Sequence, residues 1–572
     1  MRPLVAVVAA FTCAMSPADL TLVRDGQPAC AIVLARETTG VAREAAAELQ
    51  DHLRQMSGAE VPIAYDDDPP EGTRILVGDS ALTSDLGLNS DDFDIEQIVI
   101  RAIGDDLVVM GDDAKPSGTE LQGTYLAACE LLENVLGVRW LWPGELGTII
   151  PERATVTVPA DLNITISPRL LKRNIRNIQW NARVQRGLDK LGFTREQFDE
   201  VHRDGAAWSR RHRIGGSFRG GYGHAYGKFW ETYGEEHPEW FALQPDGTRD
   251  QSKVGNRARL CISNQELIAE IARLKIEELQ ANPDRDCVSI SPNDGGASTF
   301  CTCESCEAWD SPDGPMIQFW WPDTDNRRID HVSLSDRFFR FYSAIAEIVA
   351  EQCPDRMLGA YAYSAYTSVP IDAPVHPNLL VGFVGLNYMN RESGEESLER
   401  WRGWSAKANH LFLRPNLLGG GMSWPVNFVR RLGKDVQSFI AGGLTVTDFD
   451  CCYQHWATKG LAYYVLAEVL WNPSADVDAL ISDYCRAGWG PAASEVESYF
   501  LAIERKTDEI SEASTYMNRK QSQPVIAEFY TDDFLDECQG HLDAARARAA
   551  GDETILARID FLQAGGTYAR LN

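Results

Sequence analysis

The feature that most constrains the fold of this chain is a repeated alternation of strand-like and helix-like segments that begins near residue 168. Short β-rich runs predict strands at residues 171–178, 220–226, 287–291, 357–363, 379–386, 410–413 and 443–447. Apolar residues at helical spacing predict helices between them, at residues 195–211, 265–279, 333–353 and 424–439. Such an alternation favours parallel strands joined by crossover helices.

We predict that these strands close into a TIM-like (β/α)8 barrel over residues 166–475. Seven strands are named above, and the eighth is placed near residues 463–471. An open doubly wound sheet is the alternative, but no glycine-rich dinucleotide fingerprint and no phosphate-binding loop follows any of the strands. Because the active site of such a barrel lies at the carboxyl ends of its strands, the residues that follow the strands are the candidates for function.

Two further regions flank the predicted barrel, and the fold class of the whole chain is α/β. Residues 19–165 contain strand patterns, an amphipathic helix at 42–56 and a hairpin that turns at Gly104-Asp105-Asp106. No cluster of catalytic residue types occurs in this region, so we predict that it forms a small α/β accessory domain. Residues 476–572 have helical patterns and are predicted to form a helical C-terminal region.

Residues 1–18 have the pattern of an export signal. Arg2 supplies the positive charge, residues 4–15 are largely apolar, and small residues offer cleavage after Ala14 or Ala18. The alternative is an N-terminal strand with a frayed end. We expect an exported protein, periplasmic or extracellular.

The net charge of −29 limits the partners of the chain. A surface of this sign repels a phosphate backbone, so nucleic acid is not an expected partner. No segment after the N-terminus has the roughly 18 consecutive apolar residues of a membrane span. The acidity fits a neutral substrate better than a polyanionic one.

The strongest candidate for chemistry is the pair Asn293 and Asp294, which follows the strand predicted at 287–291 and precedes two glycines. Cleavage of a glycosidic bond needs a proton donor at the leaving oxygen and a group that stabilises the developing positive charge. Asp294 would be the acid, and Asn293 would orient an acetamido group of the substrate. The alternative is an ordinary turn, in which such residues are common.

A second candidate group follows the strand predicted at 443–447. Asp448 and Asp450 are two carboxylates beyond its end, and Trp456 is one of the aromatic residues that come next. Asp448 or Asp450 would be a second carboxylate of the site, and Trp456 would stack on a sugar ring. A solvated loop is the alternative.

Further substrate-binding candidates lie near other strand ends. Aromatic faces and planar cationic groups suit sugar rings and hydroxyls. The candidates are His224 and Tyr363 at two strand ends, Arg173 and Trp180 near the first strand, and Glu239, an alternative acid in the run His237-Pro-Glu-Trp-Phe241. A lone histidine is more often structural, and core packing is the alternative for the tyrosines.

Cys301, Cys303 and Cys306 form the one cluster among the 13 cysteines. Zinc sites usually have four ligands in pairs, so three cysteines favour a disulfide or a pinned loop over a metal. No HExxH motif or histidine-rich arrangement accompanies them. We therefore predict no catalytic metal and no cofactor.

Several stretches resemble known families. Residues 46–50 with 56–58, and residues 131–140, resemble the N-terminal domain of hexosaminidase- and α-glucuronidase-type enzymes. Residues 237–241, 260–264, 291–294 with the three cysteines, and 361–364 resemble the domain of unknown function 4838 family. That family is similar to glycoside hydrolase family 163, retaining β-N-acetylglucosaminidases that act on N-glycans. The resemblance covers most of residues 30–490.

The resemblance implies a barrel and a retaining mechanism assisted by the acetamido group of the substrate. Related enzymes place an acidic or amide residue near a glutamate acid, whereas here Asn293 precedes an aspartate, which keeps Glu239 as the alternative acid. The leading hypothesis is a glycoside hydrolase that cleaves a β-linked N-acetylglucosamine-type residue of a glycan. A uronic-acid glycosidase, in which Arg173 or Arg176 holds a carboxylate, and a non-catalytic sugar-binding barrel are the alternatives.

Overall fold

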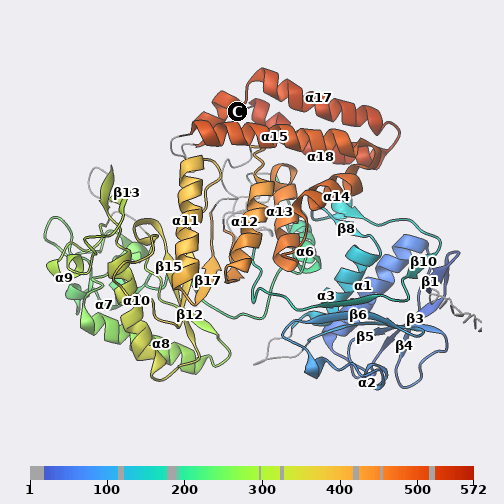
Figure 1. Cartoon of the computed structure of the whole chain (residues 1–572), viewed down its shortest axis with the longest axis horizontal. Helices are drawn as coiled ribbons and strands as arrows, with labels where there is room; N and C mark the ends of the chain where they lie inside the picture. The colour runs from blue at the N-terminus through green and yellow to red at the C-terminus, as the bar shows by residue number, and fades with distance from the viewer. Residues whose placement is uncertain are drawn as a thin grey trace, which may run out of the picture. The chain divides into compact units, whose positions relative to one another are not determined.

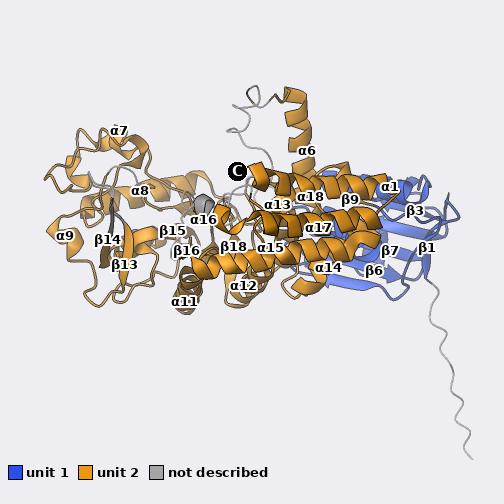
Figure 2. Ribbon diagram, turned by 90° about the horizontal axis from the view of Figure 1, so that it is seen from above, with its two compact units in different colours: residues 1–114, 120–138, 150–167 blue, residues 115–119, 139–149, 168–572 orange. Residues whose placement is uncertain are grey.

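The computed structural model describes residues 19–113, 121–176, 190, 192–294, 298–321, 327–416, 424–450, 455–514 and 522–571. The chain divides into two compact units, which Figure 2 shows in separate colours. Unit 1 contains residues 1–114, 120–138 and 150–167, and unit 2 contains residues 115–119, 139–149 and 168–572.

Unit 1 is built on a six-stranded mixed sheet in the order β11-β6-β7-β5-β3-β4, beside a three-stranded sheet in the order β10-β1-β2. Its strands are β1 (Leu20–Arg24), β2 (Gln27–Pro28), β3 (Cys30–Leu34), β4 (Ile63–Tyr65), β5 (Thr73–Val77), β6 (Ile98–Ile103), β7 (Asp106–Gly111), β10 (Val156–Val158) and β11 (Asn163–Ile166). Its helical elements are α1 (Gly40–Ser57), α2 (Ala81–Asp85), η1 (Ser90–Asp92), α3 (Gly123–Glu130) and η3 (Leu131–Val135).

Local sequence signals set the limits of α1. The Thr39 hydroxyl accepts a hydrogen bond from the Ala42 N–H at the start, and Gly58 ends the helix with φ at 78°. Leu49 and Leu53 are fully buried on its apolar face. The predicted hairpin between β6 and β7 is present, so this unit confirms the helix and hairpin patterns read from the sequence.

Unit 2 contains a parallel sheet of five strands in the order β12-β15-β16-β17-β18. The strands are β12 (Cys287–Ser289), β15 (Met357–Ala362), β16 (Leu379–Phe383), β17 (His410–Leu413) and β18 (Leu444–Thr447). Helices α8 (Gln265–Ala281), α10 (Ser335–Ala350), α11 (Arg391–Lys407) and α12 (Val429–Ala441) alternate with them (Figure 1). The α/β class is confirmed.

Isolated bridges extend this sheet at both edges. On one side Lys172 pairs with Val446, and Ile175 pairs with Phe449, in parallel. On the other side residues 220–224 pair with residues 287–291, also in parallel. The described strands form an open sheet with these two additional segments, and its closure into a barrel stays a prediction.

The remaining elements of unit 2 include α13 (Trp456–Trp471), where the sequence analysis placed an eighth strand. That prediction was wrong, because a continuous apolar run does not distinguish a strand from a buried helix, and nearly every residue of α13 is buried. The other elements are β8 (Arg139–Trp140), η4 (Glu145–Gly147), β9 (Thr148–Ile149), α6 (Arg195–Arg211), α7 (Phe229–Tyr233), η5 (Pro238–Trp240), η6 (Gly255–Arg257), α9 (Glu304–Glu307), β13 (Met316–Trp321), β14 (Arg327–Val332), η7 (Ser364–Tyr366), α14 (Val477–Trp489), η9 (Gly490–Ala492), α15 (Ala493–Ala513), α16 (Ser522–Phe529), α17 (Asp532–Arg548) and α18 (Glu553–Leu571).

The C-terminal helices pack on one another and on α13, with contacts between α14 and α15, α15 and α17, α17 and α18, and α13 and α18. Each amphipathic helix thereby buries its apolar side. Among the described residues, no helix combines the length and the apolar character that crossing a membrane requires.

One glycine makes room for the aromatic core of the sheet. Gly382 of β16 is in register with Tyr361 of β15 and Phe412 of β17. Paired residues of neighbouring strands share a face, so a side chain at 382 would point where those two rings lie. A Cβ atom there would lie 2.1 Å from the Phe412 ring. That ring packs with its centroid 4.7 Å from the Tyr222 ring and 5.9 Å from the Tyr361 ring.

We expect Gly382→Ala to lower the free energy of unfolding by about 1–3 kcal/mol, the usual cost of overpacking a core. The measurement is urea unfolding followed by fluorescence. Gly566→Ala in α18 is the control, because an added Cβ there has no atom within 4 Å and alanine suits a helix better than glycine by about 0.5–1 kcal/mol. Equal stabilities of Gly382→Ala and the unchanged chain would contradict the packing described here.

Candidate active site

The residues that follow the parallel strands of unit 2 meet at one edge of the sheet, because the carboxyl ends of parallel strands lie together. Asn293 and Asp294 follow the β12 strand, and Tyr363 follows β15. Arg414 follows β17, Asp448 and Asp450 follow β18, and Arg176 directly follows Ile175, which pairs with Phe449. The sequence analysis had chosen most of these residues.

Asp448 lies at the centre of a buried ionic network. Its side chain is 0% exposed, and one of its oxygens accepts hydrogen bonds from Arg176 Nε at 2.6 Å and from Asn174 Nδ2 at 2.7 Å. Its other oxygen is hydrogen-bonded to Arg176 Nη2 and lies 3.7 Å from Arg414 Nε. Both oxygens are occupied by donors, so this carboxylate is placed to hold its neighbours rather than to donate a proton.

Asp450 continues the network toward solvent. Arg414 Nη2 donates to its carboxylate at 2.5 Å, and Arg176 Nη1 lies 3.5 Å from the same oxygen. Burial alone would lower the pKa of Arg176. The hydrogen bond from Arg176 to Asp448 and the negative charge of Asp448 have the larger effect, so the pKa of Arg176 is raised. Arg176 is 33% exposed and Asp450 18%. These two side chains are the accessible members of an otherwise buried set.

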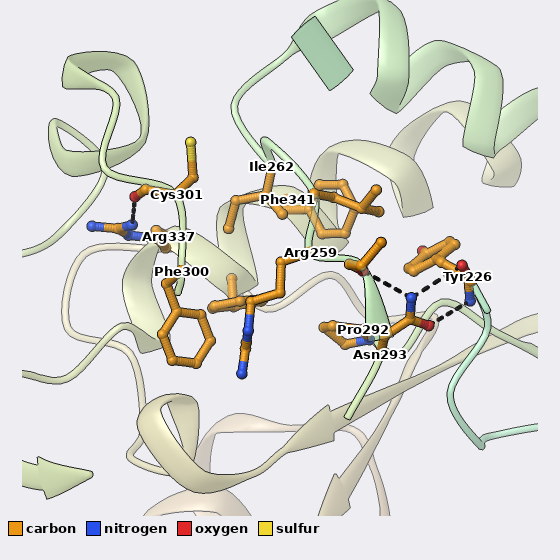
Figure 3. Close-up of a pocket in the computed structure, with 12 residues that line it drawn as sticks. Tyr226, Arg259, Ile262, Pro292, Asn293, Phe300, Cys301, Arg337 and Phe341 are labelled. Carbon is orange, nitrogen blue, oxygen red and sulfur yellow. Dashed lines mark hydrogen bonds between the residues drawn. The ribbon is translucent and has the colours of Figure 1, made fainter. Parts of the chain in front are cut away.

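Asn293 uses its amide to fasten loops together. Its Oδ1 accepts from the Tyr226 N–H at 3.1 Å, and its Nδ2 donates to the carbonyls of Tyr226 at 3.0 Å and Ala258 at 2.9 Å (Figure 3). The residue is buried. With its donors and acceptor directed at backbone groups, Asn293 fixes the position of the loop that carries Asp294.

Asp294 is half-buried and shares its surroundings with Arg259 and two tyrosines. Burial lowers the pKa of Arg259. Electrostatic interactions with Tyr366, Asp294 and Tyr363 act in the opposite direction but are weaker than the effect of burial. The Arg259 guanidinium lies 3.8 Å from the centre of the Phe300 ring, and its Nε donates to the Ser298 carbonyl at 3.1 Å. An acid, a cation and phenols therefore meet at this strand end.

His224 lies beside this group and is exposed. It pairs with Ser291 across the sheet edge, and its Nδ1 is hydrogen-bonded to the Pro292 carbonyl. A carbonyl only accepts, so Nδ1 carries the proton in this bond and Nε2 of the neutral ring is an acceptor. The ring also meets Tyr361 edge to face at 5.6 Å. These two contacts hold the ring of the exposed His224 in place.

Tyr363 stands at the end of β15, next to a strained residue. Its ring centroid is 6.5 Å from that of Tyr361 and 6.4 Å from that of Tyr366. The following residue, Ser364, has φ at 52°, which is uncommon for a residue with a side chain. Strain of this kind, of the order of 1–3 kcal/mol, gathers at functional sites.

Other predicted residues lie elsewhere. Glu239 lies in η5 with 49% of its side chain exposed, and its own backbone N–H together with His237 lowers its pKa. Arg173 is buried, and its Nε donates to the Arg213 carbonyl at 2.7 Å. Trp456 packs on Trp208 with ring centroids 4.9 Å apart. Trp180 lies outside the described residues. The geometry brings none of the three described residues into the Asp294 group.

Sequence reasoning did not select three residues that the geometry brings forward. They are Asn174, Arg259 and Arg414. Arg414 directly follows a predicted strand, so the rule that selected Asp448 also applied to it. Arg259 lies in a loop. Its position directly before the apolar run at residues 260–262 is the one signal in the sequence that could have selected it.

The structure also gathers four cysteines, because Cys261 joins Cys301, Cys303 and Cys306. The cluster predicted from the sequence lacks Cys261, which lies 40 residues before Cys301 in the chain. Leu260 and Ile262 beside Cys261, and Phe300 beside Cys301, line the pocket of Figure 3 together with Asn293. These four thiols have the chemistry to hold a metal ion.

We expect Asp448→Asn to lower the free energy of unfolding by about 3–5 kcal/mol, the usual cost of leaving one partner of a buried ion pair uncompensated. Glu395→Gln is the control, because Glu395 pairs with Arg391 at the surface with both side chains more than 60% exposed, and such pairs contribute about 0–1 kcal/mol. Urea unfolding of both variants measures the difference. Similar midpoints would show that the Asp448 network does not stabilise unit 2.

A comparison with family models agrees with the sequence motifs. The model of the family described as Domain of unknown function (DUF4838) matches residues 142–501. No curated protein matches the chain. Among solved structures, the chain is similar to a family GH115 4-O-methyl-α-glucuronidase with specificity for decorated arabinogalactans, at 11% identity and a TM-score of 0.49, over 96% of this chain and 77% of that chain. It is also similar to the Streptomyces plicatus N-acetyl-β-hexosaminidase, at 12% identity and a TM-score of 0.39, over 85% of this chain and 93% of that chain.

Proposed function

The chain belongs to the DUF4838 family, as its motifs predict, and we propose that it is a glycoside hydrolase. The observation that carries the proposal is the group around Asp294 at the carboxyl end of the parallel strands. A half-buried carboxyl, an exposed histidine and tyrosine rings are groups that suit a sugar site.

Asp294 is the acid in this proposal. Asp448 has both carboxylate oxygens taken by arginine and asparagine donors. Glu239 is exposed, and the lowered pKa of its carboxyl disfavours a proton donor. Of Asp294, Asp448 and Glu239, Asp294 is the one that is half-buried at a strand end, and Asn293 fixes its loop. It would protonate the glycosidic oxygen as the bond to the anomeric carbon breaks.

The proposed substrate is a β-linked N-acetylglucosamine-type residue. In the retaining mechanism that the motifs imply, the acetamido oxygen of the substrate attacks the anomeric carbon, and water later opens the resulting ring and restores the acetamido group. Because Asn293 is fully engaged with backbone groups, the acetamido group would be oriented by another side chain. Tyr363 and Asp450 are the accessible candidates.

The arginines of the site favour a neutral sugar over a uronic acid. Asp448 lies against Arg176, and Asp450 lies against both Arg176 and Arg414. A carboxylate on the substrate would have to displace or approach these two aspartates, which carry the same charge. A neutral sugar can instead accept and donate hydrogen bonds at the exposed edges of Arg176 and Asp450. Export of the chain, which the first 18 residues suggest, would bring it to such glycans.

We expect Asp294→Asn to abolish turnover, with a loss of about 100-fold or more for a missing general acid, while the fold and sugar binding stay intact. The measurement is mass spectrometry of the products released from a complex N-glycoprotein and from an aryl β-N-acetylglucosaminide. Asp313→Asn is the matched control, because Asp313 is an exposed aspartate of the same unit.

Free N-acetylglucosamine or released glycan from the unchanged chain and from Asp313→Asn, but not from Asp294→Asn, would support the proposal and distinguish exo from endo action. Full activity in Asp294→Asn would remove this residue from the mechanism. An aryl glucuronide is tested in parallel, and product from this substrate but from neither of the others would favour the uronic-acid enzyme. Binding of a sugar in calorimetry without any product would favour a sugar-binding protein.

A further inference from the structure

Four cysteine side chains of unit 2 converge on one point. Cys261 comes from the segment before α8, and Cys301, Cys303 and Cys306 come from the segment that follows the Asp294 loop. Their sulfur atoms all lie within 4.8 Å of one another. Cys261 Sγ is 3.6 Å from Cys303 Sγ and 3.9 Å from Cys306 Sγ. Three of the four residues are buried, and Cys303 is half-buried.

These separations are those of ligands around a common ion rather than those of a disulfide. The sulfur atoms of a disulfide are about 2.05 Å apart. Four thiolates at about 2.3 Å from a tetrahedral zinc ion are about 3.8 Å apart from one another. The distances from Cys261 Sγ to Cys303 Sγ and to Cys306 Sγ bracket that second value.

The local backbone suits a metal knuckle. Cys303 and Cys306 have the C-x2-C spacing, and the short helix α9 begins directly after Cys303. The Cys306 N–H donates to the Cys303 carbonyl at 3.0 Å, which makes a tight turn between the two thiols. Structural zinc sites use this spacing because such a turn directs both sulfur atoms to one side.

The surroundings of the sulfurs supply donors and positive charge. The Leu243 N–H lies 3.2 Å from Cys301 Sγ, and Ser263 Oγ lies 3.1 Å from Cys306 Sγ. Arg249 is close enough to interact with Cys261 and Cys303. A zinc ion with four thiolates carries a net charge of about −2, which hydrogen-bond donors and a cation around the sulfurs stabilise.

We infer that Cys261, Cys301, Cys303 and Cys306 bind one Zn²⁺ ion in a closed structural site. Four sulfur ligands select zinc or iron among common metals. Four protein ligands leave no open position for a substrate or water, so the ion has no direct part in catalysis. This assignment adds a metal to a chain for which the sequence alone predicted none, and it goes beyond the proposed hydrolase function.

The zinc ion would fix the wall of the pocket next to the candidate acid. Leu260 and Ile262, on either side of Cys261, line this pocket, and so does Phe300, which precedes Cys301 (Figure 3). Arg259 and Phe300 are in contact across the two segments that the ion would join. Arg337 adds a further connection, because its Nη1 donates to the Cys301 carbonyl at 2.8 Å. Without the ion, contacts such as those of Arg259 with Phe300 and Ser298 would be left to join the two segments.

The test is metal analysis of the purified full chain by inductively coupled plasma mass spectrometry, after production in zinc-containing medium. We expect about one zinc per chain, and a fall to well below half of this in Cys303→Ser, because removing one of four thiolates weakens such a site strongly. Cys353→Ser is the matched control, because Cys353 is also a half-buried free cysteine. It should keep the zinc content of the unchanged chain.

A second measurement does not depend on the folding of a variant. The unchanged chain, reconstituted with Co²⁺, should show thiolate-to-cobalt charge-transfer bands and the visible bands of tetrahedral cobalt. A chain that takes up neither Zn²⁺ nor Co²⁺ under reducing conditions would overturn the proposal. So would stoichiometric iron, or a disulfide among these four cysteines found by mapping of alkylated peptides. Metal content is read without any substrate, so failure of the hydrolase proposal would leave this result unaffected.

Discussion

The buried charge of Asp448 is the constraint on which the arrangement of the strand ends depends. Its carboxylate is fully enclosed and accepts hydrogen bonds from Asn174 and Arg176. A buried carboxylate without donors is strongly unfavourable, so the segment at 171–176 must stay beside β18. The segment at 171–176 and β18 are thereby held as neighbours, together with the candidate residues Arg176, Asp448 and Asp450.

The sequence predicted the elements of unit 2 well where its hydrophobic pattern was periodic. The helix predicted at 195–211 has the same limits in the structure, and the five strands of the parallel sheet lie where β-rich runs were found. The pattern failed at α13, because a helix buried on all sides has no polar face from which a period can be read. It also missed the hairpin of β13 and β14, which lies in a connection between predicted elements.

The clustering of the candidate residues at the strand ends was predictable from the sequence, but their burial and hydrogen bonding were not. The rule that function follows parallel strands selected Asp294, Asp448 and Asp450 from the sequence. It gave no information on burial, and burial separates Asp448 from Asp294: Asp448 is fully buried, whereas Asp294 is half-buried. Cys261 could not be assigned to the cysteine cluster, because its contacts with Cys303 and Cys306 arise only when two distant segments fold against each other.

The balance of charges around the site connects its structure with its proposed substrate. A network that pairs Arg176 and Arg414 with Asp448 and Asp450 has little net charge to offer a ligand. Its selectivity must then come from the directions of its hydrogen-bond donors and acceptors and from its aromatic faces, as in sites for neutral sugars. Directional recognition requires side chains that do not move. Asn293 provides this on one side of the loop after β12, through its bonds to Tyr226 and Ala258. A metal crosslink among the four cysteines would provide it on the other side.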